Sequence, residues 1–207
     1  MKRVLAEREK RLSSFHIVVS TDEGEHHAEH EFWFRSPNKS RGHLKVPNEV
    51  ELVFDGAKLS RILYPAKVVE PVPLDMPPQQ RAFFLASTFM PFAPEGFRTP
   101  LLPMSGVSVT VSGERVTLDV DPGEGVKVKY VLRWPSGDFL EKRTLAAGNE
   151  RVLKVLAEKC DEKLKLCVPV KLEESITGLD GAAEVLGRTE VTSVEFNPAL
   201  SEQFFSP

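Results

Sequence analysis

Apolar and polar residues alternate along most of the first 75 residues, a pattern typical of β-strands with one covered face. Residues 29–36 bring three aromatic side chains together, so both faces of that strand are expected to be covered. Asp55-Gly56 lies between two strand patterns and is one of the strongest signals for a tight hairpin turn. Residues 67–74 contain prolines that cannot donate to a neighbouring strand, which predicts an edge strand. The strands expected in this half are 15–21, 29–36, 41–46, 49–54, 58–64 and 67–74.

Two segments show helical rather than alternating spacing. Residues 1–14 place apolar side chains three and four positions apart, which predicts a helix at the start of the chain. Residues 77–90 open with two prolines, which suit the first turn of a helix, and their apolar residues then follow helical spacing. Residues 91–103 are rich in proline and apolar side chains, so we expect a packed loop there, because a flexible linker would be polar.

Strand patterns resume after this loop and continue to the end of the chain. Residues 106–120 alternate cleanly around Ser112-Gly113, which predicts a hairpin. Residues 151–160 fit a helix about as well as a strand, and both interpretations remain open. The pattern as a whole predicts one α+β domain spanning residues 1–207, with about ten or eleven antiparallel strands, an N-terminal helix and one helical insertion. The other strands expected here are 126–134, 139–145, 164–174 and 184–197.

Composition and charge exclude several classes of protein. The chain is 41% hydrophobic and 28% charged, which a folded protein shows and a disordered one does not. A net charge of -3, with basic residues spread along the chain, does not predict the basic patch that binds nucleic acid. No window approaches the roughly 18 apolar residues of a membrane span. The first 14 residues lack the apolar core of a signal peptide, so we expect that any export signal has been removed from this chain.

The sequence offers no catalytic centre and no cofactor site. It has neither the Gly-x-Ser-x-Gly elbow of many hydrolases nor a glycine-rich phosphate loop. His26, His27 and His30 lie among glutamates and are the one group that resembles a metal site. His26 and His30 would lie on the order of 13 Å apart along a strand. We therefore expect a solvated polar face beside a turn, without a metal.

The two cysteines, Cys160 and Cys167, match no zinc or redox spacing. If 151–160 and 164–172 are strands joined by a turn at 162–165, the two residues face each other across the hairpin. Their Cα atoms would then lie about 4.5–5.5 Å apart, which is within disulfide range. The helical alternative for 151–160 would leave the cysteines apart, so the bond tests that choice.

The order of these elements resembles a known family, the periplasmic lipoprotein carrier LolA with its relative LolB and the broader outer-membrane lipoprotein-sorting proteins. REKRLSSFHIVVST, residues 8–21, resembles the family's entry into its first strand. The stretch 31–70 resembles its aromatic strand, Pro-Asn turn and Asp-Gly hairpin, and 191–207 resembles its closing strand. The resemblance covers nearly the whole chain. It implies a single curved, unclosed β-barrel whose helical insertion covers the concave face, and a cavity there for acyl chains.

A cavity of this kind needs apolar walls and almost no polar anchors, and the chain is rich in phenylalanine between residues 83 and 97. Any one of these side chains could equally be ordinary core, so the assignment rests on the group. Met adds adaptable packing. The expected cavity residues are Phe32, Phe34, Leu52, Phe54, Ile62 and Tyr64 from the strands, and Phe83, Phe84, Phe89, Met90 and Phe92 from the helical cover.

Three positions depart from the carrier's pattern. Ser36 stands where the carrier has an arginine before the proline of the first turn, and Ser40 and Gly42 stand where it has aromatic residues. These departures favour a divergent relative over the shuttle itself. The function expected is non-catalytic binding and transfer of lipid or lipoprotein acyl chains in the bacterial envelope, periplasmic or outer-membrane-associated, with peripheral membrane contact. The alternative is an envelope sensor or protein-interaction module that uses the same fold to bind protein partners without lipid transfer.

Overall fold

The computed structural model describes residues 1–207 except 47–48, 90, 99–105, 124 and 179–180, and except the side chains of Gln79 and Phe83. The described residues form thirteen strands, two α-helices and one 3-10 helix. In chain order the elements are α1 (Lys2–Arg11), β1 (Ser14–Glu23), β2 (His26–Arg35), β3 (Lys39–Val46), β4 (Val50–Phe54), β5 (Leu59–Leu63), β6 (Val68–Val72), α2 (Pro78–Phe89), β7 (Val107–Ser112), β8 (Arg115–Gly123), β9 (Val126–Arg133), β10 (Phe139–Ala146), β11 (Asn149–Asp161), β12 (Leu166–Thr177), β13 (Ala183–Phe196) and η1 (Gln203–Phe205).

All thirteen strands belong to one sheet with the order β6-β5-β4-β3-β2-β1-β13-β12-β11-β10-β9-β8-β7. Among the described residues β6 and β7 each pair on one side only, so the sheet is unclosed. The α+β class, the N-terminal helix and the helical insertion are confirmed. The number of strands is thirteen rather than about eleven. The segments expected from the sequence hold twelve strands when the 106–120 hairpin is counted as two. Residues 151–160, which fit either period, form the thirteenth, β11, because β10 and β12 both pair with them.

The chain separates into two compact units, and the single domain expected from the sequence stays a prediction. We call them the β7–β12 unit and the β2–β6 unit. The first comprises Met1–Arg11, Asp22–Glu25 and Glu95–Glu190, and the second comprises Leu12–Thr21, His26–Pro94 and Val191–Pro207.

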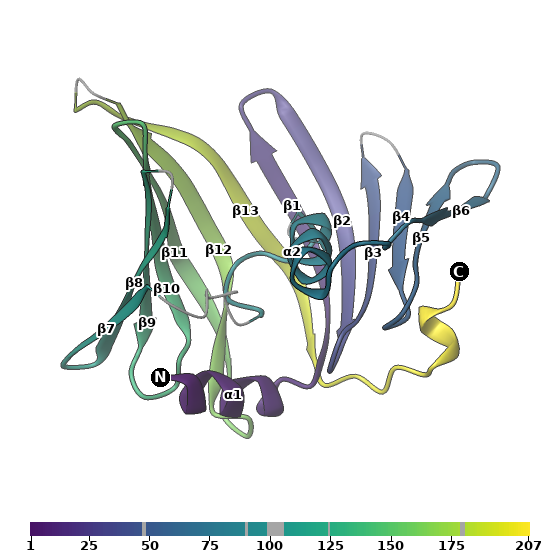
Figure 1. Cartoon of the computed structure of the whole chain (residues 1–207), viewed down its shortest axis with the longest axis horizontal. Helices are drawn as coiled ribbons and strands as arrows, with labels where there is room; N and C mark the ends of the chain where they lie inside the picture. The colour runs from purple at the N-terminus through teal and green to yellow at the C-terminus, as the bar shows by residue number, and fades with distance from the viewer. Residues whose placement is uncertain (47–48, 90, 99–105, 124, 179–180) are drawn as a thin grey trace. The chain divides into compact units, whose positions relative to one another are not determined.

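In the β7–β12 unit, α1 lies across the lower ends of the strands in Figure 1 and shares one hydrophobic core with them. Leu5 of the helix packs with strand residues that include Leu118 and Tyr130. Arg8 is 2% exposed, and its guanidinium pairs at 3.3 Å with the carboxylate of Asp138, which is 1% exposed. Removing two charges from water is costly unless each meets the other, so this pair fixes where α1 lies against the β9–β10 turn.

The hairpin between β11 and β12 carries the expected disulfide. Cys160 pairs with Cys167 in the strand register, and their Cα atoms are 4.0 Å apart. The connecting turn covers 162–165, as predicted. Arg11 donates to the carbonyl oxygen of Lys165 at 2.5 Å, so α1 is tied to this hairpin as well. The disulfide bond and the strand interpretation of 151–160 are both confirmed.

The β2–β6 unit has two distinct faces because directly opposed residues of an antiparallel pair point the same way. Phe32 opposes Gly42, which opposes Leu52, and these side chains lie on the face that α2 covers (Figure 1). Trp33 opposes Arg41, and both lie on the other face, together with the C-terminal segment. The strands are therefore covered on both sides, as the aromatic run at 29–36 predicts.

The predicted hairpin at Asp55-Gly56 is confirmed, with a four-residue loop in place of a two-residue turn. Phe54 opposes Leu59, so residues 55–58 form the connection. The Asp55 carboxylate accepts hydrogen bonds at 2.7 Å from the backbone N–H groups of Ala57 and Lys58. Gly56 has a φ of 103°, a conformation that glycine adopts without a steric penalty.

Candidate functional site

The most extensive aromatic cluster of the β2–β6 unit lies between α2 and the sheet, and we call it the phenylalanine layer: Phe15, Phe32, Phe34, Phe89 and Phe92. The Phe32 ring lies 5.8 Å from Phe89 and 6.5 Å from Phe92, centroid to centroid. On the strand side, Phe15 lies 5.7 Å from Phe32 and 5.4 Å from Phe34. All five side chains are buried. Rings at these distances add specific aromatic contacts to the burial of their area.

Gly42 lets the phenylalanine layer sit directly on the backbone of β3. A Cβ built at Gly42 would lie 2.7 Å from two carbon atoms of the Phe92 ring, closer than real Cβ atoms approach. Gly42 is one of the two positions at which the LolA carrier is expected to have an aromatic side chain. Here Phe92, from the turn after α2, occupies the space over that strand, so the departure at Gly42 is matched by an aromatic residue from another segment.

His30 is the polar member of this neighbourhood. Its side chain is 4% exposed, and its ring packs edge-on against Phe92 at 5.7 Å. Burial lowers the pKa of His30 from 6.5 to about 4, while a hydrogen bond to the backbone of Phe92 opposes that shift. Within the described residues the Nε2 atom has no hydrogen-bond partner. The ring is therefore neutral near pH 7, and the layer carries no charge at this point.

The expectation of one solvated polar face for His26, His27 and His30 is wrong for His30. His26 and His27 are exposed, whereas His30 is buried. The signal that was missed is the two-residue period of a strand: His30 shares the face of Phe32 and Phe34. In the part of the chain that the structure describes, no group of three or more His, Cys, Asp or Glu side chains is placed to hold a metal ion.

The structure brings together some of the expected cavity residues. Phe32, Phe34, Phe89 and Phe92 lie in the phenylalanine layer, and buried Phe54 lies on the same face. Leu52 shares that face but is only half-buried, and Phe84 on α2 is also half-buried. The side chain of Phe83 and the whole of Met90 lie outside the described residues.

Ile62 and Tyr64 correct the sequence argument, because they point to the opposite face. Phe54 opposes Leu59, and Glu51 opposes Ile62, so odd-numbered residues of β5 share the face of even-numbered residues of β4. Across this hairpin even-numbered residues of one strand oppose odd-numbered residues of the other, so Ile62 does not share the face of Phe54. Tyr64 instead lies beside Glu51, with the hydroxyl 3.3 Å from the carboxylate.

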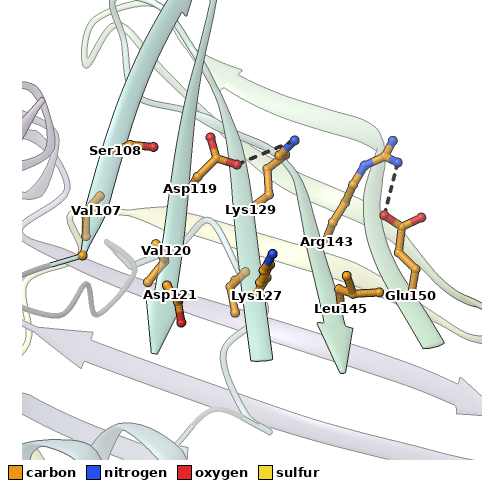
Figure 2. Close-up of a pocket in the computed structure, with 12 residues that line it drawn as sticks. Val107, Ser108, Asp119, Val120, Asp121, Lys127, Lys129, Arg143, Leu145 and Glu150 are labelled. Atoms are coloured by element: carbon orange, nitrogen blue, oxygen red, sulfur yellow. Dashed lines mark ion pairs between the residues drawn. The ribbon is translucent and has the colours of Figure 1, made fainter. Parts of the chain in front are cut away.

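A separate open groove of about 660 Å³ lies on β7–β11 of the β7–β12 unit (Figure 2). Its charges are matched: Lys129 lies 3.6 Å from Asp119, and Arg143 lies 3.6 Å from Glu150. Its apolar walls come from Val107, Val120, Val128 and Leu145, and charged side chains of both signs lie among them. None of the expected cavity residues lines it.

The sequence matches no protein-family model, and no curated protein sequence matches it. Solved structures do share its fold. A LolA superfamily protein from Nitrosomonas europaea superposes with a TM-score of 0.57 at 9% identity, over 100% of this chain and 97% of that chain. A DUF1329 family protein from Desulfovibrio piger gives 0.54 at 8% identity, over 99% and 96%. A complex of Pseudomonas aeruginosa MucA/MucB gives 0.42 at 16% identity, over 100% and 59%, which is too low to support an argument.

At identities this low, a likeness concerns the fold and not the activity. The two higher scores cover almost the full length of both chains, so the match extends over the whole architecture and not over one hairpin. The resemblance expected from the sequence is confirmed at this level: the chain has the LolA-like fold.

Proposed function

We propose that the protein binds an acylated ligand, a lipid or a lipoprotein, between α2 and the sheet of the β2–β6 unit, and passes it on without catalysing a reaction. The observation that carries the proposal is the phenylalanine layer, which a single short helix covers in a fold shared with a LolA superfamily protein. Phe89, at the end of α2, and Phe92, in the following turn, are the residues of this segment that contact Phe32.

The energetics suit a carrier. Each acyl CH₂ group removed from water contributes about 0.8 kcal/mol, so a chain that leaves a membrane must find an equivalent apolar surface. In the structure the layer is closed, with Phe32 0%, Phe89 3% and Phe92 6% exposed. An entering chain therefore replaces ring contacts that α2 and its following turn now make. Exchanging one apolar contact for another makes transfer nearly neutral, and small packing differences then set its direction.

The uncharged state of the layer supports the same proposal. A charged group in an apolar site loses its hydration and must be paired. His30, the buried titratable group beside Phe92, has a pKa lowered to about 4 by burial and is neutral near pH 7. An acyl chain that enters here meets no charge from this side chain.

We further propose that the protein works in the bacterial periplasm or at the outer membrane. The Cys160–Cys167 bond supports this, because disulfides form and persist in oxidising compartments. No helix in the described residues is both long and apolar enough to cross a bilayer. We propose that ligand exchange takes place by peripheral contact with a membrane or with another carrier.

The test is uptake of a fluorescent fatty acid by Phe89→Glu, with Ser87→Glu as the matched control. Both variants add one carboxylate to α2, but Phe89 is 3% exposed and contacts Phe32, whereas Ser87 is exposed. We expect Phe89→Glu to weaken uptake at least tenfold and Ser87→Glu to retain it. Thermal unfolding measured alongside shows that the protein still folds, and Phe89→Ala repeats the comparison without a charge. If a folded Phe89→Glu variant takes up the probe as well as the parent, the proposed site is wrong.

A further inference from the structure

The second face of the β2–β6 unit holds the last residues of the chain. Trp33, Arg35, Lys39 and Arg41 lie on this face, because Arg35 opposes Lys39 and Trp33 opposes Arg41 in the strand register. We call these four residues the cationic face. The C-terminal segment 198–207 lies against it, with one 3-10 turn, η1.

Two arginines of the cationic face hold the backbone of this segment. Arg35 donates through Nη1 to the carbonyl oxygen of Leu200 at 2.6 Å, and Arg41 donates through Nη1 to that of Phe204 at 2.6 Å. Hydrogen bonds from a charged donor are roughly twice as strong as those between neutral groups. Backbone contacts of this kind are independent of sequence, so any peptide that follows the same path could make them.

The side chains add sequence selectivity. The Glu202 carboxylate forms ion pairs with both Arg35 and Lys39. Phe205 is 0% exposed, and the Arg35 guanidinium lies 5.9 Å from its ring centroid. The face therefore recognises a carboxylate that precedes an aromatic pair, with Arg35 contacting both features.

Phe204 packs against two residues of the cationic face, Trp33 and Arg41. Its ring lies edge-on to Trp33 at 5.4 Å, and the Arg41 guanidinium lies 5.0 Å from its centroid. Arg41 is in turn fixed by the carboxylate of Glu51, at 2.5 Å, and Glu51 is 4% exposed and lies 3.3 Å from the Tyr64 hydroxyl. These supports belong to the strands and their ends, so the contacts that position Arg41 do not involve the tail.

We infer that the cationic face is a peptide-recognition site whose resident occupant is the chain's own segment 201–205. Its partner is a protein segment that carries a carboxylate two residues before a pair of aromatic side chains, as Glu202, Phe204 and Phe205 do here. The three cations of the face and the acidic peptide are complementary in charge. The tail blocks the site until such a segment displaces it.

The carboxylate of the tail is weakly held, whereas Phe205, 0% exposed, must leave its buried position when a partner binds. Glu202 is 66% exposed, and exposed ion pairs contribute little to affinity because water and salt screen them. A tethered segment nevertheless competes at an effective concentration of about millimolar. A second copy of this chain gains nothing by exchanging tails, because each exchange replaces one tail by an identical one. A partner segment whose carboxylate or aromatic pair fits better gains binding free energy relative to the tail, and such a segment is the occupant we propose.

The experiment uses a fluorescein-labelled peptide of residues 197–207 and a variant with a weakened tail, Glu202→Lys with Phe204→Ala, in the full chain. Phe205 is retained because it is fully buried. We expect fluorescence anisotropy to show one peptide per chain, bound at least tenfold more tightly by the weakened-tail variant than by the parent. A peptide carrying the same two changes should not bind. Adding Lys39→Glu should weaken binding at least fivefold, whereas Lys10→Glu, the same charge change on α1, should leave it unchanged.

Three results would overturn the proposal. One is equal peptide binding by the parent and the weakened-tail variant. Another is loss of cooperative unfolding in that variant, because the tail would then be part of the core and not displaceable. The third is a parent chain that sediments as a dimer and becomes monomeric when the tail is weakened, because the occupant would then be a second copy of this chain.

Discussion

Because the ring of His30 is buried, the free energy of unfolding should decrease as the pH is lowered. Burial lowers its pKa from 6.5 in the unfolded chain to about 4 in the folded protein. Between these two values the unfolded chain binds a proton that the folded protein does not. Acid therefore stabilises the unfolded state, and the effect begins as pH falls below 6.5 and is complete below 4. Above pH 6.5 both states are neutral, and the ring makes no pH-dependent contribution.

The size of the effect follows from the shift in pKa. A difference of 2.5 units, from 6.5 to 4, at 1.36 kcal/mol per unit corresponds to about 3 kcal/mol. At pH 4.5, where most of the transition has taken place, the loss is about 2.5 kcal/mol. The ring is 4% exposed, so little of this value is lost to solvent screening. A loss of this size is a large part of the stability of an ordinary domain.

The assay is urea unfolding followed by tryptophan fluorescence at pH 7 and pH 4.5. His30→Leu removes the titrating group while keeping an apolar side chain beside Phe92, and His26→Leu changes an exposed ring on the same strand. Between the two pH values the parent should lose about 2.5 kcal/mol more than His30→Leu. His26→Leu should behave like the parent. If His30→Leu loses as much stability on acidification as the parent, the assignment of the pH dependence to this ring is refuted.

Three further predictions concern stability and use the same urea assay at pH 7. Gly42→Ala should cost about 1–3 kcal/mol, because the added Cβ forces the ring 2.7 Å away to move; an unchanged midpoint would contradict the close contact. Asp138→Ala should cost about 3–5 kcal/mol by leaving Arg8 buried without its partner, and a cost under 1 kcal/mol would show that Arg8 finds water. Replacing Cys160 and Cys167 by serine should cost about 2.5 kcal/mol for a loop of this length, and equal midpoints with and without reductant would count against the bond.

Much of the fold could be predicted because its signals are local. Strand alternation and turn residues depend on neighbours in the sequence, and they placed both hairpins around Asp55-Gly56 and Ser112-Gly113. The disulfide could be predicted conditionally, since a turn at 162–165 fixes which residues oppose each other. Residues 151–160 could not be assigned, because only pairing with strands on both sides decides between the two periods.

The candidate site was harder to predict because its members meet across the fold. Phe32 and Phe89 could be named as apolar side chains of a strand and a helix, but their contact depends on packing. Ile62 was placed on the wrong face, since a strand's face depends on the register of its hairpin. His30 was missed because neighbouring polar residues suggested a solvated strand. The contacts between the C-terminal segment and the cationic face could not be foreseen, because they join residues far apart in the sequence.

The central claim is that an acyl chain enters between α2 and the sheet of the β2–β6 unit by replacing the ring contacts that close the phenylalanine layer. Native mass spectrometry of the parent protein, after isolation from a bacterial envelope or incubation with phospholipid vesicles, tests it most directly. The account predicts a bound species with the mass of an acylated lipid, released on collisional activation, and its loss in Phe89→Glu but not in Ser87→Glu. A parent protein that shows only the mass of the bare chain after both treatments would contradict the account.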